Sequence, residues 1–165
     1  MVGNVRKFKA IGENIYKVAQ NILDNQALCK LLKYTDNAPL EHADLSEEER
    51  AKLLHQNILF VPKVPENDNV KGSFVIFLYD SINPDEGNGE FKSVDITILV
   101  LCPAENWVIN APSLRPFLIM SEIDKMLNGK KLSNIGKLTF RGADRFVMTN
   151  QLTGYSMSYG TYEFN

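Results

Sequence analysis

The sequence predicts an α+β domain, a mainly antiparallel sheet with a long β-hairpin, flanked by N-terminal and central helices. Three observations support this. Residues 72–103 contain two runs rich in β-branched and aromatic residues on either side of a polar loop. Residues 7–23 and 113–128 place apolar side chains at helical spacing. The last quarter of the chain returns to short strand-like runs, so helices and strands are segregated along the sequence.

The two arms of the predicted hairpin, residues 73–79 and 91–102, differ in pattern, and residues 81–90 form the expected loop between them. The first arm is apolar without a break, which predicts that both of its faces are covered. The second arm alternates, with Val94, Ile96, Ile98 and Val100 on one face. Its other face is polar near the loop and apolar at Leu99 and Leu101, so a further surface should cover the base of the hairpin. That cover is either part of the same chain or another subunit.

The N-terminal region should hold three helices. Phe8, Ile11, Ile15, Val18 and Ile22 predict an amphipathic helix over residues 7–23, and Asn25 can cap a short second helix. Residues 34–40 are a predicted loop. Ser46 and Glu49 have the spacing of a capping box, which predicts a helix that runs to residue 56 or 57. An extended segment over residues 58–62 and a mobile polar excursion over residues 63–71 should follow.

After the hairpin, residues 107–109 should be extended, and Ser113 is the expected N-cap of the last long helix. Pro116 fits the first turn of that helix, and Gly129 fits a left-handed C-cap. Strands are predicted over residues 132–141, 146–148 and 153–162. In the last of these a glycine and serine face can approach another backbone, whereas Tyr155 and Tyr159 supply contact area on the other face.

Composition bounds the classes of function. A chain of 165 residues with 44% hydrophobic and 23% charged residues predicts one globular domain spanning residues 1–165. The net charge of -2 gives no basic field for nucleic acid. Two distant cysteines, Cys29 and Cys102, favour buried free thiols in a reduced compartment. We expect no signal peptide and no membrane span, and therefore folding in the cytoplasm.

Residues that could carry chemistry are few. His42 and His55 lie outside any recognisable nucleophile context and are expected at the surface, although His42 with Glu41 and Asp44 is a conceivable metal cluster. The hairpin loop lacks the register of a calcium loop, and no pocket can be inferred around Glu90 and Asp95 as an acid–base pair. We expect no catalytic residue, no cofactor and no metal site.

The order of several stretches resembles the tail terminator proteins of long-tailed bacteriophages, also called tail completion or tail-to-head joining proteins. These stretches are NQALCKLLKY at residues 25–34, the hairpin, RPFLIMSEID at 115–124 and NQLTGYSMSY at 150–159. The resemblance implies a structural virion protein of the tail or neck, assembled in the host cytoplasm. It implies a homohexameric ring that caps the tail tube protein, ends tube polymerisation and joins the tail to the head–tail connector, with DNA only as passing cargo.

The resemblance also suggests contact residues. The hairpin loop, with Asp85, Glu86, Asn88 and Glu90, would line the DNA channel and repel phosphate. Leu99, Leu101, Tyr155 and Tyr159 would contact neighbouring subunits or partners. A head-completion or neck protein is an alternative within the same class. From other classes, the chain can be read as a small enzyme that uses Asp95, Glu90 and His42, or as a module that binds peptides by strand addition.

Overall fold

In the described part of the chain, six strands form one mixed sheet in the order β1-β2-β3-β6-β5-β4. The computed structural model describes residues 3–61, 71–84, 91–132 and 136–162. The strands are β1 (Ile58–Leu59), β2 (Phe74–Pro84), β3 (Phe91–Pro103), β4 (Lys131–Leu132), β5 (Gly136–Val147) and β6 (Leu152–Tyr162). The helices are α1 (Gly3–Asp24), α2 (Gln26–Lys33), α3 (Glu47–Ala51) and α4 (Arg115–Leu127), with 3-10 turns η1 (Pro39–Glu41) and η2 (Ala104–Asn106). The α+β class is confirmed.

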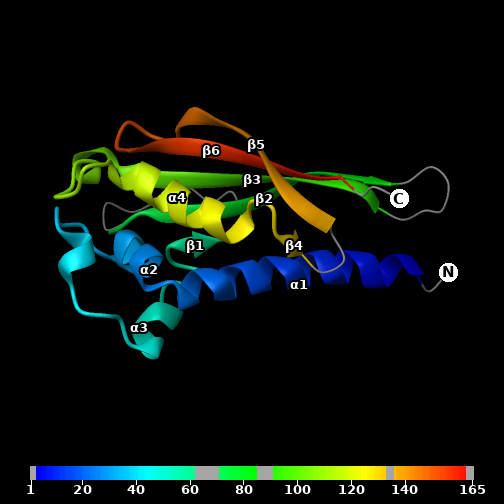
Figure 1. The fold of residues 1–165 in the computed structure, drawn as a ribbon, viewed down its shortest axis with the longest axis horizontal. Coiled ribbons are helices and arrows are strands. Elements are labelled where there is room, and N and C mark those ends of the chain that lie inside the picture. Colours follow the sequence, from blue (N-terminus) through cyan, green and yellow to red (C-terminus); the bar gives the residue numbers. More distant parts are fainter. Residues whose placement is uncertain (1–2, 62–70, 85–90, 133–135, 163–165) are drawn as a thin grey trace.

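All strand pairings are antiparallel except that of β1 with β2. The long strands run along the long axis of the molecule, with α1 beside them and α4 across the sheet (Figure 1). β2 and β3 pair from Phe74 opposite Leu101 to Pro84 opposite Phe91, so the predicted hairpin is confirmed. Its first arm is longer than expected. Ser81–Pro84 were assigned to the loop, but they continue β2 after a register shift between Tyr79 and Ser81.

The first two helices follow the sequence pattern closely. The apolar residues Ile11, Val18 and Ile22 of α1 are buried in the main core together with the inner face of β3, as predicted. α1 begins before the predicted start at residue 7. The side chain of Asn25 accepts a hydrogen bond from the backbone N–H of Leu28 at 3.0 Å, which confirms it as the N-cap of α2.

The capping box of α3 is confirmed, but the helix is shorter than predicted. Ser46 Oγ accepts from the Glu49 N–H at 3.2 Å, and a Glu49 carboxylate oxygen accepts from the Ser46 N–H at 2.9 Å. The helix ends at Ala51 because the chain then turns, and His55 has a φ of 65°. The carbonyl of Leu53 accepts hydrogen bonds from the backbone N–H groups of both Asn57 and Ile58. The chain then enters β1 at Ile58, close to where the predicted helix was expected to end.

The sheet separates two hydrophobic clusters. The main core contains α1, α2, α4 and the inner faces of the strands, whereas the second cluster contains no helical residue. This second-face cluster consists of Leu59, Phe74, Ile76, Leu99, Leu101 and Leu152. The helices therefore cover one face of the sheet, as predicted, and strand side chains make up the apolar part of the other face.

The C-terminal half brings two corrections. The N-cap of α4 is Leu114, which makes no side-chain cap, so the prediction of Ser113 was wrong by one residue. The placement of Pro116 in the first turn and the positive φ of Gly129, 73°, are confirmed. The two predicted strands that contain Phe140 and Phe146 are one strand, β5, interrupted only by a register shift between Phe140 and Gly142.

Arg115 is a buried cation that the sequence pattern did not single out. It is 0% exposed, and its guanidinium donates to four backbone carbonyls of the described residues. Its guanidinium donates to Leu31, Tyr34, Asp36 and Asn106 at 3.0, 2.6, 2.5 and 2.8 Å. Burial lowers the pKa of Arg115 from its ordinary value. This side chain ties the end of α2 and the loop that follows it to the start of α4.

Candidate assembly surfaces

A polar network lies on the second face of the sheet, toward the tip of the hairpin. Arg141 Nη1 lies 2.7 Å from Asp95 Oδ1, and Ser81 Oγ donates to Asp95 Oδ2 at 2.7 Å. The Arg141 guanidinium lies over Gly160, where an added Cβ would overlap it. Asp95 is thus held in an ion pair and a hydrogen bond. The residues proposed for the loop, Asp85, Glu86, Asn88 and Glu90, lie outside the described part of the chain.

Leu99 and Leu101 belong to the second-face cluster and are 5% and 0% exposed. The apolar face at the base of the hairpin is therefore covered, as predicted, and the covering residues belong to the same chain. Because buried side chains cannot contact a partner without opening the chain, any contact between subunits would use other residues. This corrects the expectation that these two leucines form a subunit contact.

The two tyrosines proposed for contacts have different surroundings. Tyr159 is 0% exposed, and its hydroxyl donates to Asp124 Oδ1 at 2.7 Å. Burial raises the pKa of Tyr159, and this residue is a core side chain, contrary to the expectation. Tyr155 is half-buried beside an exposed aromatic neighbour. Its ring centroid lies 5.0 Å from that of Phe117, which is 42% exposed, and 6.2 Å from that of Trp107.

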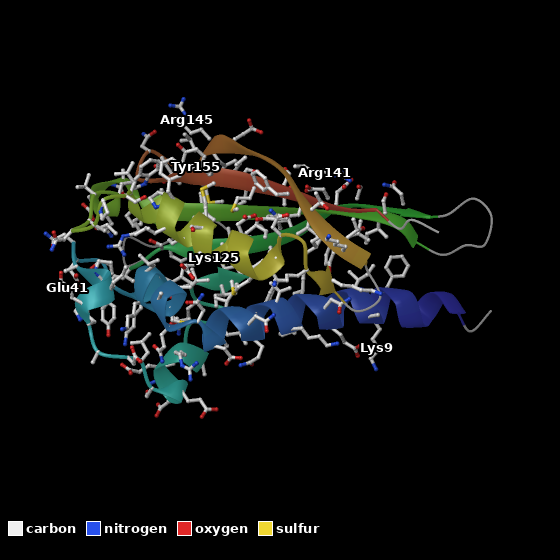
Figure 2. The ribbon with its side chains drawn as sticks, in the orientation of Figure 1. Lys9, Glu41, Lys125, Arg141, Arg145 and Tyr155 are labelled. Carbon is white, nitrogen blue, oxygen red and sulfur yellow. The ribbon has the colours of Figure 1, made fainter. Side chains whose placement is uncertain are left out.

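The outer edge of β5 is open beyond Phe140, whose backbone N–H donates to Asn128 Oδ1 at 3.1 Å. β4 pairs with β5 only at Gly136 and Lys137, and from Thr139 to Val147 no described strand lies beyond β5. Apolar side chains are exposed along this segment, with Phe140 at 39% and Val147 at 57%. Figure 2 shows Arg145 pointing away from the body of the molecule. The segment 139–147 is called the β5 edge below.

The other end of the sheet also has an open stretch. β1 pairs with β2 only at Val75 and Ile76, so no described strand flanks the outer side of β2 from Phe77 to Pro84. The Tyr79 hydroxyl donates to the Ile11 carbonyl at 3.0 Å, which places α1 on the core side of this strand. Burial raises the pKa of Tyr79 to about 12. The segment 77–84 is called the β2 edge.

A second set of exposed apolar side chains lies on the α1 side of the molecule. Phe8 is 60%, Tyr16 53% and Val61 54% exposed. The rings of Tyr16 and Phe60 approach to 5.1 Å, and His55 lies against both. A hydrogen bond joins α1 to β2, whereas α4 contacts β3, β5 and β6, so this set and Phe117 lie toward different ends of the strand order.

His42 does not gather metal ligands. Its Nε2 lies 2.7 Å from Asp36 Oδ2, and its ring stacks on Tyr34 at 3.7 Å. Glu41 accepts a hydrogen bond from Asn110, and Asp44 forms an ion pair with Lys30 at 2.7 Å. The three residues of the conceivable cluster therefore point to separate partners. Hydrogen bonding to His42 lowers the pKa of Asp36.

Comparison with known families finds a match over residues 25–161 to the family described as YomW. The chain belongs to the YomW family. This is a phage-derived family of the SPbeta-like prophage type, so the protein is phage-related. No curated protein matches the chain. The matched region contains all six strands, α2, α3 and α4, whereas α1 precedes it.

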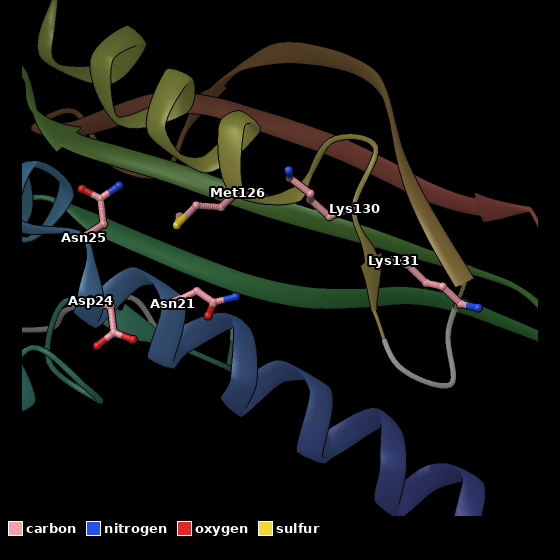
Figure 3. Close-up of a pocket in the computed structure, with 6 residues that line it drawn as sticks. All are labelled: Asn21, Asp24, Asn25, Met126, Lys130 and Lys131. Atoms are coloured by element: carbon pink, nitrogen blue, oxygen red, sulfur yellow. The ribbon is translucent and has the colours of Figure 1, made fainter.

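One open pocket of the YomW-family chain lies between the end of α1, the start of α2 and the end of α4 (Figure 3). Its lining residues are Asn21, Asp24, Asn25, Met126, Lys130 and Lys131. The Asn25 amide also donates to Glu122 at 3.0 Å, outside this lining. In Figure 3 the Lys131 side chain points away from Asp24 and the two asparagines. The lining is mixed in charge and its groups do not converge on one point.

None of the helices in the described part of this YomW-family chain is long and apolar enough to cross a membrane.

Sequence reasoning missed the surfaces that stand out in the structure. Phe117 was placed in the last helix without a role, and Phe140 and Val147 were divided between two strands. Which strand lies at the edge of a sheet depends on pairings between distant segments, so a single alternating pattern does not reveal it. One signal in the sequence could have found these surfaces. The strand β5 carries aromatic residues among charged ones, and exposed apolar residues are unusual on a solvated edge strand.

Proposed function

We propose that this chain is a structural virion-assembly protein, a tail terminator that caps the phage tail tube as a hexameric ring. In this role it ends tube polymerisation and joins the tail to the head connector, with DNA passing through the ring. Membership of a phage-derived family supports the proposal, as does the resemblance of the sequence layout to tail terminator proteins.

The observation that carries the proposal is the presence of two different exposed apolar surfaces on one subunit. Phe117 and Val147 lie toward the β5 end of the sheet, and Tyr16 and Val61 lie toward the β1 and β2 end. A closed ring with more than two copies needs a head-to-tail interface, in which one surface of each subunit meets a different surface of the next. Two distinct patches fit that requirement.

Native mass spectrometry of the purified full-length chain over a concentration series tests the ring. We expect the fraction of the protein that is hexameric to rise with concentration. A chain that stays monomeric throughout the series and does not bind tail-tube protein overturns the proposal.

A mixing experiment then tests the placement in the virion. Tail-tube protein of the same phage is polymerised with and without the chain, and tubes are measured by electron microscopy. We expect shorter tubes with a ring at one end. Binding to the head connector without any effect on tubes would assign the chain to the head side of the neck and contradict the terminator role.

A further inference from the structure

An asparagine followed by glycine ends α4. The sequence contains two such pairs, Asn88-Gly89, which lies outside the described residues, and Asn128-Gly129. Asn128 is the C-cap of α4 and is exposed, and Gly129 follows it with a φ of 73°. Asparagine before glycine is prone to spontaneous deamidation, because glycine has no side chain to hinder attack by its backbone nitrogen on the asparagine carboxamide. The fold around Asn128 therefore decides whether this chemistry takes place.

The reaction has two steps and consumes only water. The Gly129 nitrogen loses its proton to solvent base and forms a bond to Cγ of Asn128. The Cγ–Nδ2 bond breaks, and the departing group takes a proton from water and leaves as ammonia. Water then opens the succinimide ring at either of its carbonyl carbons. The product at position 128 is aspartate, or isoaspartate, in which the main chain passes through the side chain and is one carbon longer.

The folded chain holds both reacting groups in hydrogen bonds. The Gly129 N–H donates to the Leu138 carbonyl at 2.8 Å, which opposes loss of its proton. Asn128 Oδ1 accepts from the Phe140 N–H at 3.1 Å, and Nδ2 donates to Asp124 Oδ2 at 3.5 Å. Ring closure also requires Cβ of Asn128 and the Gly129 nitrogen to eclipse each other about the Cα–C bond. The ψ of 125° at Asn128 keeps them apart.

These contacts belong to a short ladder beside β5. The Leu138 N–H donates to the Lys130 carbonyl at 2.9 Å, next to the bond from Gly129, and both residues of β4 pair with the start of β5. The Gly129 N–H is released when this ladder separates from β5. Because β4 is only two residues long, its separation should require less free energy than unfolding of the whole chain.

We infer that Asn128-Gly129 is a deamidation site that the folded chain keeps closed and that reacts when β4 separates from β5. Conversion then hinders reclosure. Aspartate at this position places a carboxylate where the carboxamide donates to Asp124, and isoaspartate displaces the Gly129 N–H from the Leu138 carbonyl. The site thus records opening of the connection between α4 and β5, and the inference is independent of the proposed function.

Peptide mass spectrometry of the full-length chain tests whether the site is closed. The protein is incubated at mildly alkaline pH, in buffer and in urea that unfolds it, and conversion is followed with time. In urea, Asn128 and Asn88 should convert at similar rates, so Asn88 serves as the reference within the same molecule. In buffer, conversion of Asn128 should be at least about tenfold slower than in urea. Equal rates at Asn128 in buffer and in urea would overturn the inference.

Amide hydrogen exchange tests what closes the site. Exchange of the Gly129 N–H requires release from the Leu138 carbonyl, and so does deamidation if that bond closes the site. The ratio of deamidation rates in urea and in buffer should therefore be at least as large as the exchange protection factor of Gly129. A smaller ratio would show that Asn128 reacts while the bond is intact, and would contradict the inference.

A pair of variants tests the effect of conversion. Asn128→Asp reproduces one product, and Asn150→Asp places the same charge at an exposed position between β5 and β6. We expect Asn128→Asp to exchange the Gly129 amide at least about tenfold faster than the parent, and Asn150→Asp to match the parent. Equal exchange in the two variants would show that conversion does not hinder reclosure.

Discussion

Arg141 on β5 reaches across the backbone of Gly160 on β6 to an ion pair with Asp95 on β3, with 2.7 Å between Nη1 and Oδ1. Ser81 on β2 donates to the other carboxylate oxygen of Asp95. Side chains of three strands, β2, β3 and β5, are thereby joined on the polar half of the second face, and the link from β5 to β3 passes over β6. The missing side chain at Gly160 is what lets the guanidinium cross the sheet.

Two glycines of β6 should differ in what an added methyl group costs. At Gly160 the Cβ would overlap the flexible end of Arg141, so Gly160→Ala should displace the ion pair and destabilise by about 1–2 kcal/mol. At Gly154 the Cβ would overlap the carbonyl of Val100, a backbone group of β3 that cannot move aside. Gly154→Ala should therefore cost about 3 kcal/mol or more. Urea unfolding of both proteins measures the difference, and equal losses would contradict this reading.

Replacing the buried Arg115 should show how much its carbonyl contacts contribute. Arg115→Met keeps much of the side-chain volume but leaves the carbonyls of Leu31 and Tyr34 without this donor. We expect a loss of about 2–4 kcal/mol in the free energy of unfolding. Hydrogen exchange should rise at the end of α2 and at the start of α4. Unchanged exchange at both places would show that the guanidinium does not hold these segments together.

A charge at Leu99 should unfold the chain instead of separating copies. The side chain is 5% exposed within the second-face cluster, so Leu99→Asp buries an unpaired carboxylate. We expect a loss of at least about 3 kcal/mol, measured on the monomer by thermal and urea unfolding. If the Leu99→Asp protein stays folded as a monomer but no longer assembles, Leu99 lies in a subunit interface and this prediction is wrong.

The capping box of α3 predicts a specific dependence on pH. Hydrogen bonds from Lys33 and the Ser46 backbone lower the pKa of Glu49 from 4.5 to about 2. Because the folded pKa is below the unfolded one, this stabilisation is complete above pH 4.5 and is lost as pH falls toward 2. Glu49→Gln should therefore be less stable than the parent at pH 7, and the difference should shrink below pH 4.5. A constant difference across that range would contradict an ionic contribution.

Local sequence patterns predicted the features of the fold that depend on residues close together in the sequence. The alternation at Val94, Ile96 and Ile98 predicted the core face of β3, and Asn25 and Ser46 predicted two helix starts, since caps and periodicity are local. Ser81–Pro84 looked like a turn because Asn83 and Pro84 are turn formers, yet pairing with β3 extends the strand there.

Features that depend on distant contacts were not predictable in the same way. The apolar face at Leu99 and Leu101 was recognised, but a pattern of residues does not say whether the cover belongs to the same chain. The burial of Arg115 was not predicted, because its acceptors are carbonyls contributed by separate segments. The proposed contact residues Tyr155 and Tyr159 occupy the same face of β6, and contacts with other segments, such as that of Tyr159 with Asp124, make one half-buried and the other core.

The tail-tube length in particles assembled without this chain tests the proposed role most directly. Deleting its coding sequence from the phage and imaging the tails should give tubes of irregular, excessive length that lack heads. Supplying the chain in trans should restore one length and joined particles. Tails of normal, uniform length that join heads in its absence would contradict a terminator function.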